Sequence, residues 1–314
     1  MKIVFLDTYP MGEVSLAPIE TLGDYTGYDN TPARQVVERA READIVIVNK
    51  VKLMRPEIDA LPRLKLICVS ATGVNNVDTE YAAGKGIPVK NVAGYSTESV
   101  TEATFGLVLA LLRNVVYYDR YVKDGSYAAS GLIFNMQRPV SEIRGKTWGI
   151  IGLGTIGRRV ASVARTFGAQ VVYHSTSGKK REEAYPEWPL QKLLAASDIV
   201  SIHAPLNVRT KGLIGAPELE QMKSTAILVN VARGGIVDET ALAQALDRGI
   251  IAGAGLDVFE QEPIQADNPL LKIKYPDQLV LAPHSAWTSL EAREQLVEGV
   301  AGNIRDFLNN DPKE

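Results

Sequence analysis

The stretch TWGIIGLGTIGRRVASVARTFGAQVVYHS, residues 147–175, decides the fold of this chain. An apolar run leads into Gly152, Gly154 and Gly157, which have the spacing G-x-G-x-x-G, and a helical pattern and a second apolar run follow. In a strand–turn–helix unit the first glycine permits the turn, the second lets a ligand approach the backbone, and the third lets the helix pack on the strand. The stretch therefore predicts a dinucleotide pyrophosphate site at the helix N-terminus, with a purely structural glycine turn as the alternative.

Apolar runs alternate with helical patterns through most of the chain. Those that precede this stretch and predict buried strands are 2–7, 44–49, 64–70 and 87–91, with a helix over 31–43 between the first two. The later ones are 147–154, 169–175, 198–204, 226–232, 251–259 and 279–285, and a last helical pattern covers 289–310. Such alternation is typical of parallel sheets with helices on both faces. We therefore predict an α/β protein with two Rossmann-like doubly wound parallel-sheet domains, 1–95 plus 289–314 and 96–288, and a ligand site in the interdomain cleft.

Residues 96–125 form a long helical pattern between the two series of strands. The pattern is too apolar for a solvated helix, and Glu102 and Thr104 interrupt it too much for a membrane span. We predict one helix here that crosses between the domains and is also buried against another subunit. A homodimer is therefore the expected assembly.

The bulk composition excludes several classes of function. The chain has 314 residues, 46% hydrophobic and 23% charged, with a formal net charge of −3. Nothing in this balance indicates a nucleic-acid or membrane partner, and no run approaches the ~20 apolar residues of a membrane helix. The single cysteine, Cys68, lies in an apolar run, so we expect a core residue and a reduced cytoplasmic setting. No metal site is expected.

Three polar side chains, Arg233, Glu262 and His284, follow successive predicted strands of the second series. Because the carboxyl ends of parallel strands meet at one edge of a sheet, we expect these side chains to lie near one another. They suit nicotinamide chemistry on a hydroxy acid, which needs a cation for the carboxylate, an acid/base for the hydroxyl and a group that orients this base. Of the three histidines, His174 lies beside the expected ribose and His203 near the dinucleotide, which leaves His284 as acid/base. A surface arginine, a solvated acid and a core histidine remain the alternatives.

The stretch VVYHSTSGKK, residues 171–180, has no acid where a dinucleotide fold usually places a carboxylate for the ribose. A carboxylate there would repel a 2′-phosphate, whereas the hydroxyls of Ser175, Thr176 and Ser177 suit one. Lys179 and Lys180 are within reach of such a phosphate, although lysines at the start of a helix are commonly solvated. We therefore expect an NAD(P) cofactor, with NADP(H) favoured over NAD(H) and NAD(H) not excluded.

Four motifs, GLGTIG, VNVARGGIVDETAL, GAGLDVFEQEP and LAPHSAWTS, resemble those of the D-isomer-specific 2-hydroxyacid dehydrogenase family, over essentially the whole chain. ATGVNNVD (71–78) and HSAWTS (284–289) are most similar to the glycerate dehydrogenase/hydroxypyruvate reductase branch. The resemblance implies an NAD(P)-dependent oxidoreductase that acts on the CH–OH group of a 2-hydroxy acid, as a glycerate dehydrogenase or hydroxypyruvate (glyoxylate) reductase. It also makes 1–95 plus 289–314 a flavodoxin-like substrate-binding domain and 96–288 the dinucleotide-binding domain.

The resemblance also assigns catalytic roles. Arg233 would hold the substrate carboxylate as a bidentate fork, His284 would exchange a proton with the substrate oxygen, and Glu262 would orient the imidazole and favour its charged form. Lys50 could line the substrate side, although a solvated loop lysine is equally compatible with the sequence. The backbone N–H groups expected to bind the substrate carboxylate are those of Thr72, Gly73 and Val74.

The same resemblance implies the cofactor contacts. Asp257 would contact the nicotinamide amide, and Thr155 and Ile156 would lie beside the pyrophosphate. The other expected contacts are Gly152, Gly154, Gly157, His174, Ser175, Thr176, His203, Ala204, Pro205, Val231 and Ala232.

A dinucleotide-binding regulatory protein of the corepressor type is the alternative from another functional class. Such a protein has the same fold and glycine loop but does not need a complete arginine–glutamate–histidine set. The complete set in this chain, together with the absence of a basic or disordered partner tail, favours an enzyme. A formate dehydrogenase is less favoured, since it typically has glutamine in place of Glu262.

Overall fold

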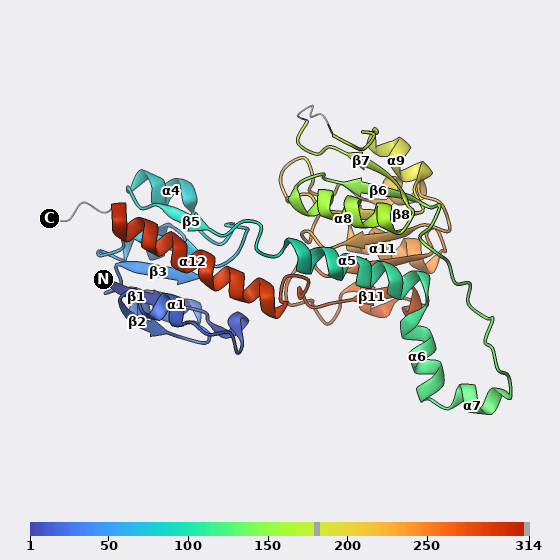
Figure 1. The fold of residues 1–314 in the computed structure, drawn as a ribbon, viewed down its shortest axis with the longest axis horizontal. Coiled ribbons are helices and arrows are strands. Elements are labelled where there is room, and N and C mark those ends of the chain that lie inside the picture. The colour runs from blue at the N-terminus through green and yellow to red at the C-terminus, as the bar shows by residue number, and fades with distance from the viewer. Residues whose placement is uncertain (179–182, 311–314) are drawn as a thin grey trace. The chain divides into compact units, whose positions relative to one another are not determined.

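The computed structural model describes residues 1–178 and 183–310 and divides the chain into two compact units. The first unit comprises Met1–Ser96 and Trp287–Glu314, and the second comprises Thr97–Ala286 (Figure 1). Each unit contains one parallel sheet, with five strands in the first and six in the second. The predicted class, two doubly wound parallel-sheet α/β units, is therefore confirmed.

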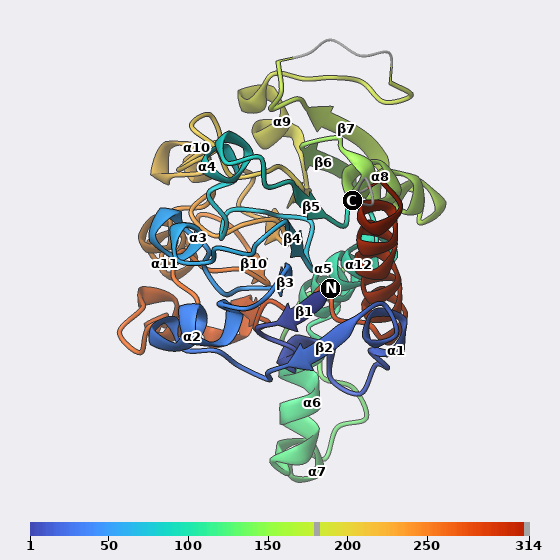
Figure 2. The same cartoon turned by 90° about the vertical axis from the view of Figure 1, so that its left-hand side faces the viewer.

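The sheet of the first unit has the strand order β2-β1-β3-β4-β5, which is the flavodoxin-like order. Its strands are β1 (Lys2–Phe5), β2 (Asp24–Gly27), β3 (Ile45–Val48), β4 (Leu66–Val69) and β5 (Val89–Asn91). Its helices are α1 (Ala17–Glu20), α2 (Val36–Ala40), α3 (Arg55–Asp59), α4 (Thr79–Gly84) and α12 (Leu290–Asn310), with 3-10 turns Tyr9–Met11 and Ala33–Gln35. Figure 2 shows α1 and α12 on one side of the sheet and α2, α3 and α4 on the other. Helices therefore cover both faces of the sheet. On each face, a separate apolar cluster lies between the sheet and its helices.

Two details of the first unit differ from the sequence prediction. Strand β2 was not predicted, because Asp24–Gly27 is a partly exposed edge strand without a continuous apolar run. The helix expected over 31–43 is shorter, with a 3-10 turn at Ala33–Gln35 and an α-helix only over Val36–Ala40. Cys68 is fully buried in the core, as predicted, and burial raises the pKa of its thiol to about 12.

The sheet of the second unit has the strand order β11-β10-β9-β8-β6-β7. Its strands are β6 (Thr147–Ile151), β7 (Gln170–His174), β8 (Ile199–Ile202), β9 (Ile227–Asn230), β10 (Gly253–Leu256) and β11 (Leu279–Leu281), so all six predicted strands form. Its helices are α5 (Thr97–Leu112), α6 (Val115–Lys123), α7 (Ser126–Ser130), α8 (Thr155–Thr166), α9 (Leu190–Ala196), α10 (Ala216–Glu220) and α11 (Glu239–Asp247), with 3-10 turns Pro269–Lys272 and Pro276–Gln278. A one-residue parallel bridge between Tyr173 and Glu187 extends the sheet beyond β7.

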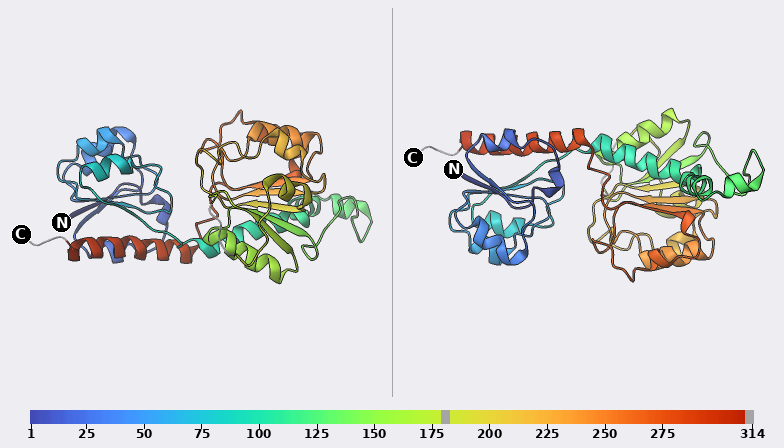
Figure 3. Two further views of the ribbon diagram at one scale, coloured as in Figure 1. Left: turned by 90° about the horizontal axis from the view of Figure 1, so that it is seen from above. Right: turned by 90° about the horizontal axis from the view of Figure 1, so that it is seen from below.

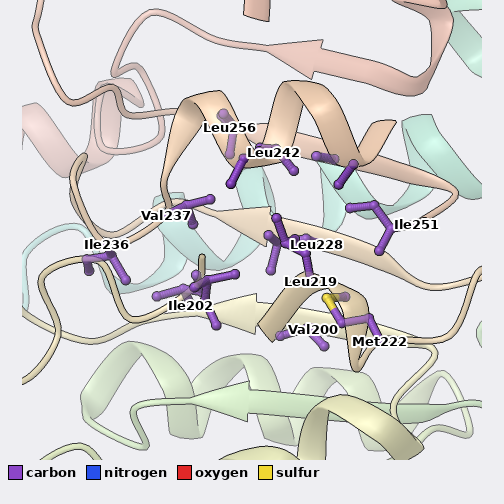
Figure 4. Packing of buried hydrophobic residues seen from close by; sticks show 14 of the residues in the cluster. Val200, Ile202, Leu219, Met222, Leu228, Ile236, Val237, Leu242, Ile251 and Leu256 are labelled. Carbon is purple, nitrogen blue, oxygen red and sulfur yellow. The ribbon is translucent and has the colours of Figure 1, made fainter. Parts of the chain in front are cut away.

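Helices cover both faces of this second sheet as well. Figure 3 shows the green helices α5 and α8 on one face and the orange helix α11 on the other. On the α11 face, side chains from β8, β9 and β10 meet those of α10 and α11, among them Val200, Leu228 and Leu242 (Figure 4). This apolar layer holds the strands in place, so the loops at their carboxyl ends have a rigid base.

The single helix predicted over 96–125 is wrong, because the chain bends by 61° between α5 and α6. Asn114, at the bend, has a left-handed backbone with φ 50°, and its side-chain amide donates to the Pro139 carbonyl at 2.8 Å. The apolar residues of α5 pack within the second unit, where Phe105 contacts Trp148 with ring centroids 4.9 Å apart. The apolar character of α5 therefore reflects its own core and does not by itself indicate a subunit interface.

Within the described residues, no single helix is long and apolar enough to cross a membrane. The pair α5 and α6 meets the length and composition requirement only when the two bent helices are taken together.

Candidate active site

The glycine loop between β6 and α8 has the geometry that a dinucleotide needs. Gly152 has a φ of +91°, and a Cβ there would lie 2.9 Å from the carbonyl oxygen of His203. A Cβ on Gly157 would collide with the carbonyl oxygen of Gly152, so this glycine lets α8 pack against the turn. Around Gly154, by contrast, no described atom outside this glycine and its two chain neighbours lies within 4 Å of the Cβ position. The open space lies where α8 begins, which is where phosphate groups bind helices.

A pocket extends from this loop to the end of β7. Its lining residues are Gly152, Leu153, Gly154, Tyr173, Ser175, Thr176, Ser177, Glu183, His203 and Pro205. The pocket thus joins the glycine turn and the end of β7, where dinucleotide folds bind the pyrophosphate and the ribose, and it also reaches the end of β8. The residues present therefore fit an NAD(P) cofactor, which the glycine loop and the Ser175–Ser177 segment would hold.

His203 is fixed in the wall of this pocket by a chain of hydrogen bonds. The buried Trp148 indole donates to Ser201 Oγ at 2.8 Å, and Ser201 Oγ lies 3.0 Å from His203 Nε2. Among the described residues the only acceptor for the serine hydrogen is His203 Nε2, so we assign the proton of this ring to Nδ1. Burial lowers the pKa of His203 to about 3, so its ring is neutral at physiological pH.

The pocket contains an acid that the sequence pattern did not indicate. Glu183 comes from the loop after β7, and its carboxylate forms a two-point ion pair with the guanidinium of Arg158 in the first turn of α8. The Arg158 Nε to Glu183 Oε2 distance is 3.0 Å, and the Glu183 side chain is 11% exposed. No motif in the sequence marks this position. Lys179 and Lys180, which the sequence placed near the same ribose, lie outside the described residues.

Several predicted cofactor contacts lie near the pocket without lining it. His174 ends β7, and its Nδ1 donates to the Trp188 carbonyl at 3.1 Å. Ala232 follows β9, and its N–H donates to Asn230 Oδ1 at 3.0 Å. The other predicted contacts that do not line the pocket are Thr155, Ile156 and Gly157 in the first turn of α8, the buried Ala204 and Val231 at the ends of β8 and β9, and Asp257 after β10. Of the predicted set, the pocket is lined by Gly152, Gly154, Ser175, Thr176, His203 and Pro205.

Arg233 lies just past the end of β9, in a turn whose shape depends on the next residue. A Cβ on Gly234 would collide with the carbonyl of Phe259, so only glycine allows this turn to pack against the segment after β10. The Asn230 side chain donates to the Arg233 carbonyl at 2.9 Å and holds the same turn from the strand side. The guanidinium of Arg233 donates one hydrogen bond to the Ala232 carbonyl at 2.7 Å, which leaves other N–H groups for a ligand.

Glu262 and His284, predicted as a pair, are in direct contact. His284 Nδ1 lies 2.7 Å from Glu262 Oε2, and the other carboxylate oxygen accepts from the Phe259 N–H at 3.1 Å. Since a carboxylate only accepts, the imidazole donates from Nδ1 and its Nε2 atom remains for proton exchange. The His284 side chain is 22% exposed, so a substrate in solution can reach this ring.

Asp257 is bound to the backbone of the segment that carries His284. Its carboxylate accepts from the N–H groups of Ser285 at 2.8 Å and Ala286 at 3.0 Å, while the His284 N–H donates to its carbonyl at 2.8 Å. His284 has a left-handed φ of 54°, which is costly for a residue with a side chain. Burial raises the pKa of the Asp257 carboxyl, and the backbone hydrogen bonds from Ala286 and Ser285 oppose this rise. The aspartate therefore holds the histidine in a strained conformation.

The first unit carries the loop predicted to bind the substrate carboxylate. Thr72, Gly73 and Val74 follow β4, and in the described part of the chain none of their N–H groups donates a backbone hydrogen bond. The loop is held by Asn91, whose amide donates to the Thr72 carbonyl at 2.6 Å. Lys50 follows β3 with an exposed side chain, while its N–H donates to the Asp7 carboxylate.

Comparison with known proteins agrees with this geometry. The D-isomer specific 2-hydroxyacid dehydrogenase NAD-binding domain matches residues 105–286. A putative 2-hydroxyacid dehydrogenase of Haemophilus influenzae is 40% identical over 312 residues, 98% of each chain. A glycerate dehydrogenase of Methylorubrum extorquens is 37% identical over 316 residues, 99% of this chain and 98% of that one. The crystal structure of an NADPH-dependent glyoxylate/hydroxypyruvate reductase from Sinorhizobium meliloti, in complex with citrate, has a TM-score of 0.85 and 30% identity, and the match covers 98% of this chain and 95% of that one.

The doubly wound sheets and the cofactor pocket at the glycine loop define an NAD(P)-dependent oxidoreductase. The chain belongs to the D-isomer-specific 2-hydroxyacid dehydrogenase family, and the resemblance seen in the sequence is confirmed. It therefore acts on the CH–OH group of 2-hydroxy acids, and the regulatory alternative is not favoured.

Proposed function

We propose that this enzyme reduces hydroxypyruvate or glyoxylate to the corresponding 2-hydroxy acid, and oxidises D-glycerate in reverse. The observation that carries the proposal is the hydrogen bond between His284 and Glu262, 2.7 Å long, at the carboxyl edge of a sheet that also presents Arg233. The curated glycerate dehydrogenase and the solved hydroxypyruvate reductase described above support this choice of substrate.

In this mechanism His284 moves the proton. Its Nδ1–H is committed to Glu262, so Nε2 is the atom that gives a proton to the substrate carbonyl oxygen in reduction and takes it back in oxidation. Glu262 stabilises the imidazolium that this exchange requires, and its own position is set by the Phe259 N–H. The bound NAD(P)H supplies the hydride that the substrate carbon receives.

The arginine side chain and several backbone N–H groups would orient the substrate. Arg233 would hold the substrate carboxylate with two parallel hydrogen bonds. In the first unit, the N–H groups of Thr72, Gly73 and Val74 would bind a substrate carboxylate, as the family resemblance implies. Asp257 keeps the His284 segment in place through Ser285 and Ala286, in addition to the nicotinamide contact that the family resemblance implies.

The test compares three variants in turnover and in cofactor binding. Arg233→Ala and His284→Ala should bind NAD(P)H as the wild type does but lose at least ~100-fold in kcat with hydroxypyruvate, because each removes a group that acts only on the substrate. Near-normal kcat in both variants would refute the assignment. Glu262→Gln should move the pH profile of kcat more than it lowers the maximum, and an unchanged profile would remove its proposed role.

We also propose a homodimer, assembled through the segment 115–140. Nine large apolar side chains of the second unit are exposed there, on α6, on α7 and on the residues that follow α7. They are Val115, Val116, Val122, Tyr127, Leu132, Ile133, Phe134, Met136 and Val140. Figure 1 shows α6 and α7 standing away from the sheet of their own unit. An apolar surface of this kind is typical of a subunit interface, and a second copy of the chain is the partner that also carries it.

A further inference from the structure

The strand-end carboxylate that usually binds the ribose of a dinucleotide is missing after β7, yet Glu183 enters the same pocket from further along the chain. Its neighbours in the pocket wall are Ser175, Thr176 and Ser177, the residues that follow β7. An acid in this position can accept a hydrogen bond from a ribose 2′-hydroxyl, and it repels a 2′-phosphate.

Arg158 changes what this acid can do. Its guanidinium meets the Glu183 carboxylate at two points, and the pair as a whole carries no net charge. The Arg158 side chain is 40% exposed and the Glu183 side chain 11%, so the arginine is the more accessible partner for an added anion. A further cation is nearby, because Arg209 donates to the Ser177 carbonyl at 3.1 Å.

We propose that the Arg158–Glu183 pair determines the choice between NAD(H) and NADP(H), with Glu183 as acceptor for the ribose 2′-hydroxyl and Arg158 as counter-charge for the 2′-phosphate. The inference rests on the cofactor site of the proposed function and adds the two residues that distinguish its ligands. The intact pair suits both cofactors, since the carboxylate serves one and the guanidinium the other. Removal of one partner changes the net charge at this end of the pocket by one unit, and the sign of the change favours one cofactor over the other.

The two single variants therefore have opposite expected effects. Glu183→Gln removes the repulsion of the phosphate and frees Arg158, so the ratio of the NADH Kd to the NADPH Kd should rise at least ~10-fold. Arg158→Gln removes one positive charge beside the Glu183 carboxylate, so the same ratio should fall at least ~10-fold. Arg158→Lys keeps the charge and should restore most of the wild-type ratio.

Helix α8 offers a matched control beside the pair. Arg159, the next residue, forms an exposed ion pair with Glu98, in which Nε and Oε2 are 2.9 Å apart. Arg159→Gln, on α8, and Glu98→Gln, on α5, remove the same chemical groups, but their ion pair includes no residue that lines the cofactor pocket. In both, the ratio of the two Kd values should stay within about twofold of the wild type.

Equilibrium titration of each protein with NADH and with NADPH, followed by cofactor fluorescence, gives both Kd values without any turnover. Opposite shifts in Glu183→Gln and Arg158→Gln, with unchanged controls, support the proposal. If the ratio of the two Kd values stays within twofold of the wild type in both variants while their thermal unfolding temperature falls, the pair only stabilises the fold. That result would overturn the proposal. If the wild type binds neither cofactor, the proposed function itself fails, and this outcome is distinct from the first two.

Discussion

At the scale of single residues, the glycines of one motif have separate physical tasks. Gly154 faces open space, whereas the Cβ position of Gly157 is filled by the carbonyl oxygen of Gly152. The motif assigns ligand approach to the second glycine and helix packing to the third, and the surroundings of the two Cβ positions agree with that assignment.

Gly154→Ala should leave the stability nearly unchanged and raise the NAD(P)H Kd at least ~10-fold, because the added methyl group occupies the space that the pyrophosphate needs. Gly157→Ala should instead lower the free energy of unfolding by about 1–3 kcal/mol, since α8 must shift to relieve the collision. Urea unfolding and cofactor titration of both variants separate the two effects. Equal losses of stability in the two proteins would contradict this division of tasks.

His203 should make the stability of the fold depend on pH. Burial lowers the pKa of His203 to about 3 from an ordinary value of 6.5. At a pH between these two values, His203 is therefore protonated in the unfolded chain but not in the folded chain. The stabilising contribution is complete above pH 6.5 and is lost as the pH falls towards 3. Since part of the residue is exposed, we expect a loss of about 1–2 kcal/mol between pH 7 and pH 5.

The measurement is the free energy of unfolding at pH 7 and pH 5 for the wild type and for His203→Gln. The glutamine cannot titrate, so the variant should lose about 1–2 kcal/mol less than the wild type over this interval. The same pH dependence in both proteins would show that other groups are responsible.

At the scale of elements, the bend between α5 and α6 is set by one residue. Asn114 has a left-handed φ of 50° and a side-chain hydrogen bond to the Pro139 carbonyl. The apolar pattern of 96–125 continues through this point, which is why the sequence predicts one helix. Periodicity reports which faces are apolar, but it does not report the single backbone angle that ends a helix.

Asn114→Ala should lower the free energy of unfolding by about 1–2 kcal/mol, because alanine loses the hydrogen bond and tolerates the left-handed backbone poorly. Asn114→Gly is the matched control, since it loses the same hydrogen bond while glycine adopts this angle freely. Chemical denaturation should find the glycine variant clearly more stable than the alanine variant. A glycine variant less stable than the alanine variant would show that the left-handed φ at position 114 does not destabilise a residue with a side chain.

Whether a strand can be predicted from the sequence depends on its place in the sheet. Nearly continuous apolar runs such as 199–202 and 227–230 mark central strands, and both lie in the middle of the second sheet. Strand β2 pairs only with β1 at the edge of its sheet, so its residues need no such run and it escapes detection.

At the scale of the whole molecule, the assembly remains a prediction that the exposed apolar side chains of 115–140 support. Ile133 and Phe134 are 78% and 74% exposed, so aspartate at either position should change the stability of the folded monomer little. In the proposed dimer the same aspartate would be a buried charge, which would destabilise the interface. Ile133→Asp/Phe134→Asp should therefore convert a dimer to a monomer, with the mass of one chain in light scattering.

Val208→Asp is the control for this experiment, because Val208 is 97% exposed in the same unit but outside the segment 115–140. It should remain dimeric. A wild-type protein with the mass of one chain would refute the dimer, and a dimeric double variant would place the interface elsewhere. The cytoplasmic location, inferred from the single cysteine, likewise stays a prediction.

The sequence by itself determined the class of fold, the glycine loop and the candidate set Arg233, Glu262 and His284. Each of these depends on local spacing, since a glycine turn or a residue just past a strand is encoded within a few neighbouring positions. Their direct contact and the strained backbone of His284 are visible only in three dimensions.

Only the tertiary structure decided which acid enters the ribose pocket. Residues 171–180 contain no carboxylate, but Glu183 lines the same pocket as Ser175 and forms an ion pair with Arg158 of α8. In the same way, the Asp257 side chain holds Ser285 and Ala286, which no motif indicates. These contacts join residues that are distant in sequence, and they depend on the path and packing of everything between them.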